Sequence, residues 1–513
     1  MLAKTGLLVV SNPKHIAKLL SDAQKAVKNT LYVQLLSALN DPLGSIHPNM
    51  FTTPKLSRTV FCIYSQATKQ CNNLDVRVLL SSFKHNISQI HTQNPIDIII
   101  FDKKYTKADI ESFISTKISN VSNDHNTLTI ECEDSEETES TSSDTDSNVY
   151  NHVVLGGTFD RLHTAHKLLL SDAILRASKK VTVGITEENM IHGKLLWELI
   201  QNVNTRVNNV FNFVSDICPE LHYDICKISD PFGPAIIDPT MDLIMVSEET
   251  IRGAEKINEL RREKQLKELK IIPIPYIEEP NPDPKEETKV SSSNLRLRLL
   301  GTLLNPIVQK EIPKRPYVIG LTGGIASGKS GVASHLENLN VPVINCDKIG
   351  HKLYEKGQPC YDPVVNNFGS QILSPEGEID RRILGGLVFK NTDQLNKLNE
   401  IMWPAIAKEV RHKINESGEA VVCVEAAILC LAGWDKFCHE VWTTIVPPNE
   451  AIDRLVKRNN LTEDQAKLRI EAQPTNSEYI NNTNVVFSPQ WEVEYTKVQV
   501  HRAWNLLQPR LAL

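Results

Sequence analysis

A glycine-rich loop past the middle of the chain has the residue types and spacing that bind nucleotide phosphates. Residues 320–330 read Gly-Leu-Thr-Gly-Gly-Ile-Ala-Ser-Gly-Lys-Ser and fit the pattern G-x-x-x-x-G-K-S/T. Glycines let backbone N–H groups converge on phosphate oxygens, Lys329 can reach the β- and γ-phosphates, and Ser330 can ligate Mg²⁺. An apolar strand pattern at 317–319 and a helical pattern at 331–339 flank the loop. This context distinguishes it from a glycine-rich turn with an exposed lysine. The residues assigned here are Gly323, Gly324, Ile325, Ala326, Ser327, Gly328, Lys329 and Ser330.

Charged residues farther along the chain are suited to phosphoryl transfer. The apolar residues 341–344 predict a strand whose end lies beside the γ-phosphate, and Asp347 follows it. A carboxylate there can orient an acceptor hydroxyl and take its proton, whereas the alternative is a helix N-cap. A later helical segment supplies Arg454, Arg458 and Arg469, which can neutralise transferring charge. The alternative for these arginines is a solvated basic face.

A second candidate site lies upstream, where a histidine motif follows a predicted strand. The strand at 152–155 runs into Gly-Gly-Thr-Phe-Asp-Arg-Leu-His-Thr-Ala-His at 156–166, followed by a helical pattern. His163 and His166 are three residues apart and share one helix face, so both can donate to phosphate oxygens. The alternatives are a metal site, for which the sequence offers no third ligand, and a structural pair.

Three hydroxyl side chains form a second candidate phosphate cradle. Ser291, Ser292 and Ser293 precede Arg296 and an apolar run, which places them at a predicted helix N-terminus. Free backbone amides and the helix dipole favour an anion there. An N-cap would explain only one of the three serines.

The elements that position these residues follow an alternating pattern. Strand and helix signals alternate through both candidate sites, which predicts α/β domains with parallel sheets. Ligands then collect at the carboxyl ends of the strands. Residues 1–128 show a similar pattern, with strands at 6–10 and 96–101, but no glycine-rich loop follows the first strand. A structural or regulatory role is predicted for this region, and an independent active site is the alternative.

An acidic segment separates this region from the histidine motif. Residues 131–147 are almost entirely acidic or hydroxylated, with no apolar face, and predict a disordered spacer. Phosphorylation of its serines and threonines is the alternative role. The predicted organisation is 1–128, a linker at 129–149, a domain at 150–312 and a domain at 313–513.

Composition narrows the class of protein. The 513 residues are 41% hydrophobic and carry a formal net charge of −6, which argues against a general nucleic-acid binder. No apolar run reaches the length of a membrane span, and no signal or transit pattern begins the chain. The ten cysteines include no C-x-x-C pair and predict reduced thiols rather than disulfides or a zinc site. A cytoplasmic protein is expected, with association with mitochondria left open.

The histidine motif and the three serines together resemble the nucleotidylyltransferase superfamily, whose hallmark is T/H-x-G-H followed by I-S-S-x-x-x-K/R. Residues 246–258 are similar to its phosphopantetheine adenylyltransferase branch in eukaryotes and archaea, although Ala165 stands where the superfamily motif has glycine. The resemblance implies a Rossmann-like domain that converts ATP and 4′-phosphopantetheine to dephospho-CoA and pyrophosphate. It makes His166 the catalytic histidine. The ATP-binding residues that it implies are Gly156, Gly157, Thr158, His163, Lys194, Ser291, Ser292, Ser293 and Arg296.

The last region is similar to dephospho-CoA kinase. The resemblance is carried by the phosphate loop, Asp347, the Asp-Arg-Arg segment at 380–382 and Arg-Ile-Glu-Ala-Gln at 469–473. Asn345 stands at the first aspartate of the family's D-x-D, and Trp403-Pro404 replaces a common His-Pro. The resemblance implies a P-loop kinase that uses ATP and Mg²⁺.

In this order the two regions resemble the bifunctional CoA synthases of animals, because the product of one step is the substrate of the next. The expected partners are the small molecules ATP, 4′-phosphopantetheine and dephospho-CoA, with regulatory partners at the N-terminal region and acidic segment as a further hypothesis. The alternatives are another nucleotidylyltransferase, such as a cytidylyltransferase, fused to a P-loop small-molecule kinase, and an ATP-binding scaffold. Oligomeric state and substrate channelling do not follow from the sequence.

Overall fold

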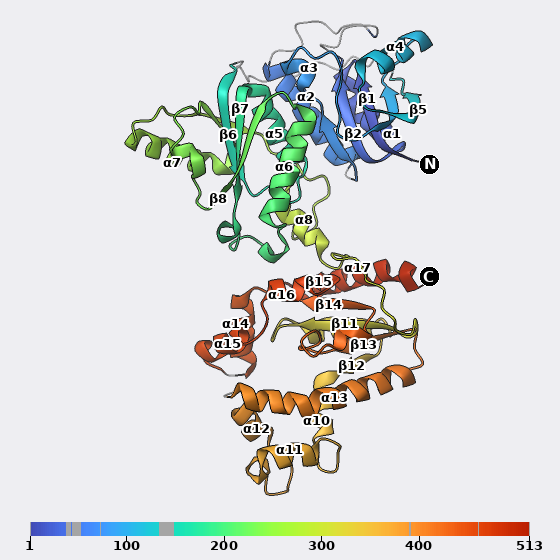
Figure 1. Cartoon of the computed structure of the whole chain (residues 1–513), viewed down its shortest axis with the longest axis vertical. Coiled ribbons are helices and arrows are strands. Elements are labelled where there is room, and N and C mark those ends of the chain that lie inside the picture. Colours follow the sequence, from blue (N-terminus) through green and yellow to red (C-terminus); the bar gives the residue numbers. More distant parts are fainter. Residues whose placement is uncertain are drawn as a thin grey trace. The chain divides into compact units, whose positions relative to one another are not determined.

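The computed structural model describes residues 2–36, 43, 53–71, 73–132, 148–388, 391–459 and 461–511. Contacts divide the chain into two compact units, Met1–Leu297 and Arg298–Leu513, and each is described by itself. Among the described residues, the first unit contains two parallel five-stranded sheets and the second contains one (Figure 1).

The first sheet is built from the N-terminal region and has the strand order β3-β2-β1-β4-β5. Parallel neighbours need crossover connections, which are mostly helical here. The elements are β1 Ala3–Val10, η1 Pro13–His15, α1 Ile16–Ala23, β2 Val27–Leu35, α2 Thr53–Gln70, β3 Asp75–Val78, α3 Ser81–Lys84, β4 Ile96–Phe101, α4 Lys107–Lys117 and β5 Val121–Thr129.

The second sheet has the order β10-β9-β6-β7-β8, with β6 at its centre. Its elements are β6 Tyr150–Gly157, α5 Thr164–Arg176, β7 Ala177–Thr186, η3 Glu188–Met190, η4 Trp197–Leu199, α6 Val203–Ile217, β8 His222–Ile228, η5 Gly233–Ile236, β9 Leu243–Ser247, η6 Glu248–Thr250, α7 Ile251–Glu263, β10 Lys270–Ile274 and α8 Ser292–Leu299. One apolar core is continuous between the first two sheets, because α2 and α5 pack against each other between them.

The third sheet has the order β12-β13-β11-β14-β15, with the phosphate-loop strand at its centre. Its elements are β11 Tyr317–Gly323, α9 Lys329–Glu337, β12 Val343–Asn345, α10 Cys346–Leu353, α11 Tyr361–Phe368, η7 Ser370–Ile372, α12 Arg381–Val388, α13 Thr392–Glu416, β13 Val421–Glu425, η8 Trp434–Phe437, β14 Glu440–Thr444, α14 Pro448–Asn459, α15 Glu463–Glu471, α16 Asn476–Asn481, β15 Val485–Phe487 and α17 Val493–Leu511.

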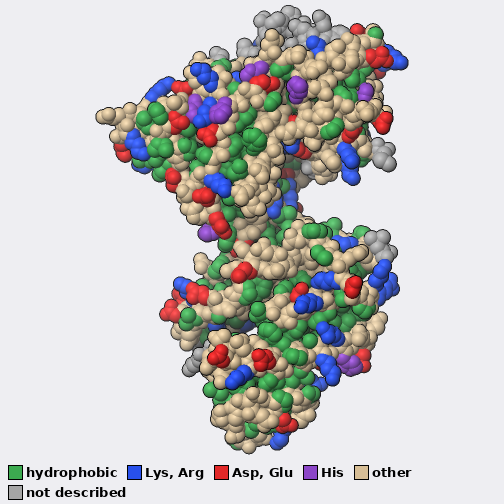
Figure 2. Space-filling view, viewed as in Figure 1, with side chains coloured by type: hydrophobic (Ala, Val, Ile, Leu, Met, Phe, Trp, Pro, Cys, Tyr) green, Lys and Arg blue, Asp and Glu red, His purple; other side chains and the backbone are tan. Residues whose placement is uncertain are grey.

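The predicted fold class is confirmed, since all three sheets are parallel and alternate with helices. Most of the acidic linker, residues 133–147, lies outside the described residues, and the predicted domain boundaries stay predictions. Among the described residues, no helix is long and apolar enough to cross a membrane. Charges of both signs are interspersed over the face shown in Figure 2.

Candidate active sites

The two histidines of the upstream motif lie together at the carboxyl end of β6, the central strand of its sheet. His163 precedes the first residue of α5 and His166 lies in its first turn. Their rings are stacked, with centroids 3.7 Å apart, and Phe159 packs against His166 at 5.1 Å. Both Nδ1 atoms are buried without a hydrogen-bond partner in the protein. Each ring of the pair therefore has one nitrogen, Nδ1, that can still form a hydrogen bond.

Both imidazoles are held neutral by their surroundings. Burial lowers the pKa of His166 to about 3. Burial, followed by the repulsion that a protonated His166 would exert, lowers the pKa of His163 well below its usual value. A neutral imidazole can still donate one N–H, so the pair is suited to hydrogen bonding with phosphate oxygens rather than to proton transfer near neutral pH.

The serine segment reaches the histidine motif across the carboxyl edge of the sheet. Ser291 accepts a hydrogen bond from the Asn294 amide at 3.2 Å and so caps the start of α8. The hydroxyl of Ser292 donates to the Asp160 carbonyl at 2.9 Å and lies 3.3 Å from His163 Nε2. The two predicted cradles therefore form one site.

Asp160 ties this site together, although its sequence context singled out only its neighbours. Its side chain is fully buried and forms an ion pair with Arg296, with Nη1 2.9 Å from Oδ2. It also accepts from Arg161 at 3.0 Å and from the Gln201 amide at 3.0 Å. Arg296 further donates to the Leu195 carbonyl at 2.7 Å, so its guanidinium links Asp160 to the segment that contains Leu195.

A second buried arginine, Arg206, was also missed. Its guanidinium donates to the Thr158 carbonyl at 2.7 Å and the Thr186 carbonyl at 2.9 Å. Arg206 is only 1% exposed, and its place inside a helical pattern gave no signal that it would hold the glycine-rich turn.

The remaining predicted residues border the same edge of the sheet. Gly156 and Gly157 end β6, and a Cβ on Gly157 would lie 3.1 Å from the Phe159 ring. Thr158 accepts from the Thr186 hydroxyl at 3.3 Å. Lys194 is exposed, and desolvation followed by the charges of Arg296 and Arg206 lowers its pKa. A cation with a lowered pKa among other cations is suited to receive an anion.

The phosphate loop has its predicted geometry between β11 and α9. Gly323 has φ of +140° and Gly328 has φ of +91°, conformations that favour glycine. The ammonium of Lys329 donates to the carbonyls of Gly323 and Gly324, each at 2.8 Å. Burial lowers the pKa of Lys329 to about 8, against the opposing effects of Asp347 and Glu425.

A cavity of about 900 Å³ opens over this loop and collects most of the predicted kinase residues. Lys329, Ser330 and Asp347 all line it. Glu425, at the end of β13, also lines it and was not predicted, because a single carboxylate that ends an apolar run gives no local signal of a binding site. The hydroxyl of Ser330 donates to Glu425 Oε1 at 3.5 Å.

The helix after β12 is capped by Asn345 and not by Asp347. The Asn345 side chain accepts from the Lys348 amide at 2.9 Å, whereas Asp347 lies in the first turn of α10. The alternative interpretation of Asp347 as an N-cap is therefore wrong, and its exposed carboxylate faces the cavity of the phosphate loop.

The three predicted arginines divide between two cavities. Arg454 donates to the Ala326 carbonyl of the loop at 3.2 Å, and Arg458 lines the same cavity. Arg469 lines a neighbouring cavity of about 950 Å³ between α13, α15 and α16, which has Trp403 and Tyr479 in its wall. The two cavities share Ile325, Ala427 and Gln473.

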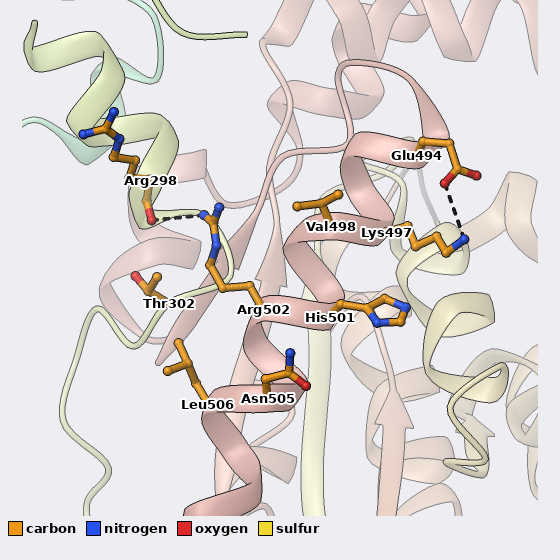
Figure 3. Close-up of a pocket in the computed structure, with 9 residues that line it drawn as sticks. All are labelled: Arg298, Thr302, Glu494, Lys497, Val498, His501, Arg502, Asn505 and Leu506. Carbon is orange, nitrogen blue, oxygen red and sulfur yellow. Dashed lines mark hydrogen bonds and ion pairs between the residues drawn. The ribbon is translucent and has the colours of Figure 1, made fainter. Parts of the chain in front are cut away.

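Two other features contain none of the predicted site residues. A groove of about 830 Å³ runs along α17, where Arg502 donates to the Arg298 carbonyl and Glu494 pairs with Lys497 (Figure 3). Within the described ranges, the side chains of metal-ligand type that cluster in a group of three or more are His85, Cys218 and Glu220. The thiol of Cys218 donates to Glu220 at 3.6 Å, and burial raises its pKa to about 12, so the cluster is suited to hydrogen bonding without an ion.

Comparison with known proteins assigns the two candidate sites to two different protein families. A family model described as dephospho-CoA kinase matches residues 317–493, and one described as cytidylyltransferase-like matches residues 154–298. The dephospho-CoA kinase of Bacillus cereus is 36% identical over 197 residues, covering 37% of this chain and 98% of that protein. That of Carboxydothermus hydrogenoformans is 38% identical over 186 residues, covering 36% of this chain and 90% of that protein. The chain belongs to the dephospho-CoA kinase family.

Solved structures match parts of the chain. Dephospho-CoA kinase from Campylobacter jejuni is 21% identical, with a TM-score of 0.30, and the match covers 38% of this chain and 98% of that one. A protein of unknown function from Archaeoglobus fulgidus is 29% identical, with a TM-score of 0.22, and the match covers 24% and 98%. The two family-model matches show that the chain joins a dephospho-CoA kinase domain to a cytidylyltransferase-like domain.

Proposed function

We propose that the chain is a bifunctional CoA synthase. Its first site transfers AMP from ATP to 4′-phosphopantetheine, giving dephospho-CoA and pyrophosphate. Its second site phosphorylates the ribose 3′-hydroxyl of dephospho-CoA with ATP. The observation that carries the proposal is the presence, in a chain with a dephospho-CoA kinase domain, of a second sheet edge where His163, His166 and Ser292 converge.

The first reaction suits a pair of neutral histidines. An oxygen of the pantetheine phosphate attacks the α-phosphorus, and the bond to the bridging oxygen breaks as pyrophosphate leaves. The nucleophile is already an anion, so no side chain has to remove a proton. Imidazole N–H groups and the serine hydroxyls would stabilise charge on the phosphates as the transition state forms, while Lys194 would approach from the exposed side.

The second reaction needs a base, because its nucleophile is a hydroxyl. Asp347 lines the phosphate-loop cavity with Lys329 and would accept the proton of the ribose 3′-hydroxyl as the new P–O bond forms. Lys329, Arg454 and Arg458 would neutralise the transferring phosphoryl group. The neighbouring cavity, with Trp403, Tyr479 and Arg469 in its wall, is large enough for the acceptor.

The oxygen donors at this site fit a magnesium ion. The Ser330 hydroxyl and the Glu425 and Asp347 carboxylates line one cavity, and hard oxygen ligands are the ones that Mg²⁺ prefers. When bound with ATP, the ion neutralises charge on the β- and γ-phosphates.

A different nucleotide at the first site is the second candidate, because the matching family model is described as cytidylyltransferase-like. A cytoplasmic location, with association with mitochondria left open, stays a prediction. Regulatory partners at the N-terminal region and the acidic segment stay a hypothesis.

Mass spectrometry of the products tests both steps at once. The full chain is incubated with 4′-phosphopantetheine, Mg²⁺ and either ATP or CTP. The expected products with ATP are dephospho-CoA and then CoA. His166→Ala should stop at phosphopantetheine yet phosphorylate supplied dephospho-CoA, whereas Lys329→Ala should accumulate dephospho-CoA. A CTP-dependent product, or loss of both activities in either folded variant, would contradict the proposal.

A further inference from the structure

Helix α5, which carries His166, is covered by the part of the first unit that contains β1 to β5. We call this part the N-terminal domain. Ten consecutive residues, from Lys167 to Arg176, are buried, although a helix on a sheet normally exposes one face. The second face is covered by α2, whose buried Val60, Ile63 and Tyr64 belong to the same apolar core as Leu170 of α5 (Figure 1). The N-terminal domain thus forms one wall around this helix.

Polar side chains on the covered face of α5 find their partners in the N-terminal domain. The ammonium of Lys167, only 6% exposed as a residue, forms an ion pair with Asp75 and donates to the Val76 carbonyl at 3.1 Å. Ser57 donates to Asp172, which lies farther along α5. Burying an ammonium or carboxylate is costly unless it is paired, so this face of α5 is adapted to the domain that covers it.

The first turn of α5 is held at both ends by this contact. Thr164, which begins the helix, shares a hydrogen bond of 2.7 Å with Thr68 of α2. The Lys167 amide donates to the His163 carbonyl at 3.0 Å, while its side chain is anchored to Asp75. His163 and His166 therefore lie on a turn whose two ends are fixed by the N-terminal domain.

The anchor at Asp75 is part of a larger charged network. Asp75 also accepts from Arg77 at 2.7 Å, and Arg77 in turn donates to the buried Asp216 of α6 at 2.6 Å. Asp216 additionally accepts from the Tyr32 hydroxyl at 2.7 Å. The positive charges of Lys167 and Arg77 equal in number the negative charges of Asp75 and Asp216. The network links β2 and β3 of the N-terminal domain to α5 and α6. Such a network holds Asp75 in one position.

We propose that the N-terminal domain positions the adenylyl-transfer site, and that Asp75 is a positioning residue that acts through Lys167 on the first turn of α5. The inference rests on the proposed function and deepens it. Displacement of a reacting group by about 1 Å can reduce a rate about 100-fold, so loss of the anchor should appear in turnover.

The central test compares Asp75→Asn with the double variant Asp75→Asn/Lys167→Met in the full chain. Asp75→Asn should lower kcat for adenylyl transfer roughly 10- to 100-fold with little change in KM. The double variant removes the unpaired ammonium, so it should regain thermal stability but not kcat. Recovery of kcat in parallel with stability, or unchanged kcat in Asp75→Asn, would overturn the positioning role.

Matched variants control for folding. Asp224→Asn removes another ion pair of the same unit, Lys180 to Asp224 at 2.9 Å, and should leave adenylyl transfer unchanged. The kinase activity of each variant reports whether the rest of the chain is intact. Thr68→Val removes the other anchor without creating a buried charge and should lower kcat several-fold. If Asp75→Asn does not fold, an unchanged kcat in folded Thr68→Val overturns the proposal.

Histidine NMR separates this inference from the proposed function. Chains with labelled histidines, assigned through His163→Asn and His166→Asn, should show shifted ring signals in Asp75→Asn but not in Asp224→Asn. This readout needs no turnover. A wild-type chain without adenylyl transfer would refute the proposed function alone, whereas unshifted ring signals in folded Asp75→Asn would refute the positioning role alone.

Discussion

The side-chain amide of Asn345 donates a hydrogen bond to the carboxylate of Glu425, with Nδ2 2.7 Å from Oε2. The two residues are register partners at the carboxyl ends of β12 and β13. The Asn345 carbonyl oxygen also accepts from the Lys348 amide at 2.9 Å, so one side chain both caps α10 and orients Glu425. Asp347, two residues on, is therefore available for chemistry in the cavity.

We expect Asp347→Asn to lower kinase turnover by a factor of roughly 10² to 10⁴, the usual contribution of a general base. The amide keeps the shape of the carboxylate but cannot take the proton of the acceptor hydroxyl. Steady-state kinetics with dephospho-CoA and ATP measures the loss, with KM for ATP, thermal stability and adenylyl transfer little changed.

Asp393→Asn is the matched control for this substitution. Asp393 lies in the first turn of α13, two residues after the N-cap Asn391, as Asp347 lies after Asn345. Its substitution should leave kinase turnover unaffected. Equal and near-normal turnover in the two variants would show that Asp347 is not the base.

Gly323→Ala should abolish most ATP binding at the kinase site. A Cβ at this position would lie 2.5 Å from the carbonyl oxygen and 2.5 Å from the hydroxyl of Thr444, and φ of +140° is strained for alanine. The loop must therefore move. Titration of ATP into a His166→Ala background, by calorimetry, isolates the kinase site.

Gly331→Ala is the control, because a Cβ there meets nothing within 4 Å and alanine favours helix by up to about 1 kcal/mol. Wild-type affinity in Gly323→Ala would contradict the assigned loop geometry.

The sequence predicted the chemistry-bearing segments better than the edges of the sheets. The loop at 320–330 and the strand at β4 were located because a glycine pattern and an apolar run are local signals. The edge strands β5 and β8 were missed, because Val121–Thr129 is mostly exposed, His222–Ile228 is mostly half-buried, and both mix polar with apolar residue types. Strands that bury little of their surface carry only a weak apolar pattern.

The site was predictable where residues lie close in sequence and not where distant residues meet. His163 and His166 share one turn, and their pairing followed from spacing alone. Asp160 contacts Arg296, 136 residues away, and Lys167 contacts Asp75, 92 residues away. Such contacts are set by the packing of segments that are distant in sequence, and no local pattern signals them.

The pair of histidines should remain neutral well below neutral pH. Burial lowers the pKa of His166 to about 3 and lowers that of His163 in the same direction, whereas an unfolded histidine titrates near 6.5. The unfolded chain then binds more protons than the folded one below about pH 6.5, so this contribution to stability is present above that pH and is lost as pH falls. NMR titration of the His166 ring between pH 8 and 5 should show no protonation. A midpoint near 6.5 would mean that the ring is not held neutral and that an acid–base role must be considered.

ATP binding at the kinase site should take up a proton above pH 8. Burial lowers the pKa of Lys329 to about 8 in the free loop, where its ammonium donates to the carbonyls of Gly323 and Gly324. The β- and γ-phosphates favour the charged form and raise this pKa, so binding at pH 8.5 converts neutral lysine to ammonium. Calorimetry in two buffers with different ionisation enthalpies measures the uptake, which should be most of one proton and should vanish near pH 6.5.

Lys329→Arg is the control, because a guanidinium stays charged throughout and adds no uptake. The difference between the two chains removes protons bound at the first site. Equal uptake in both would show that Lys329 is already fully charged before ATP arrives.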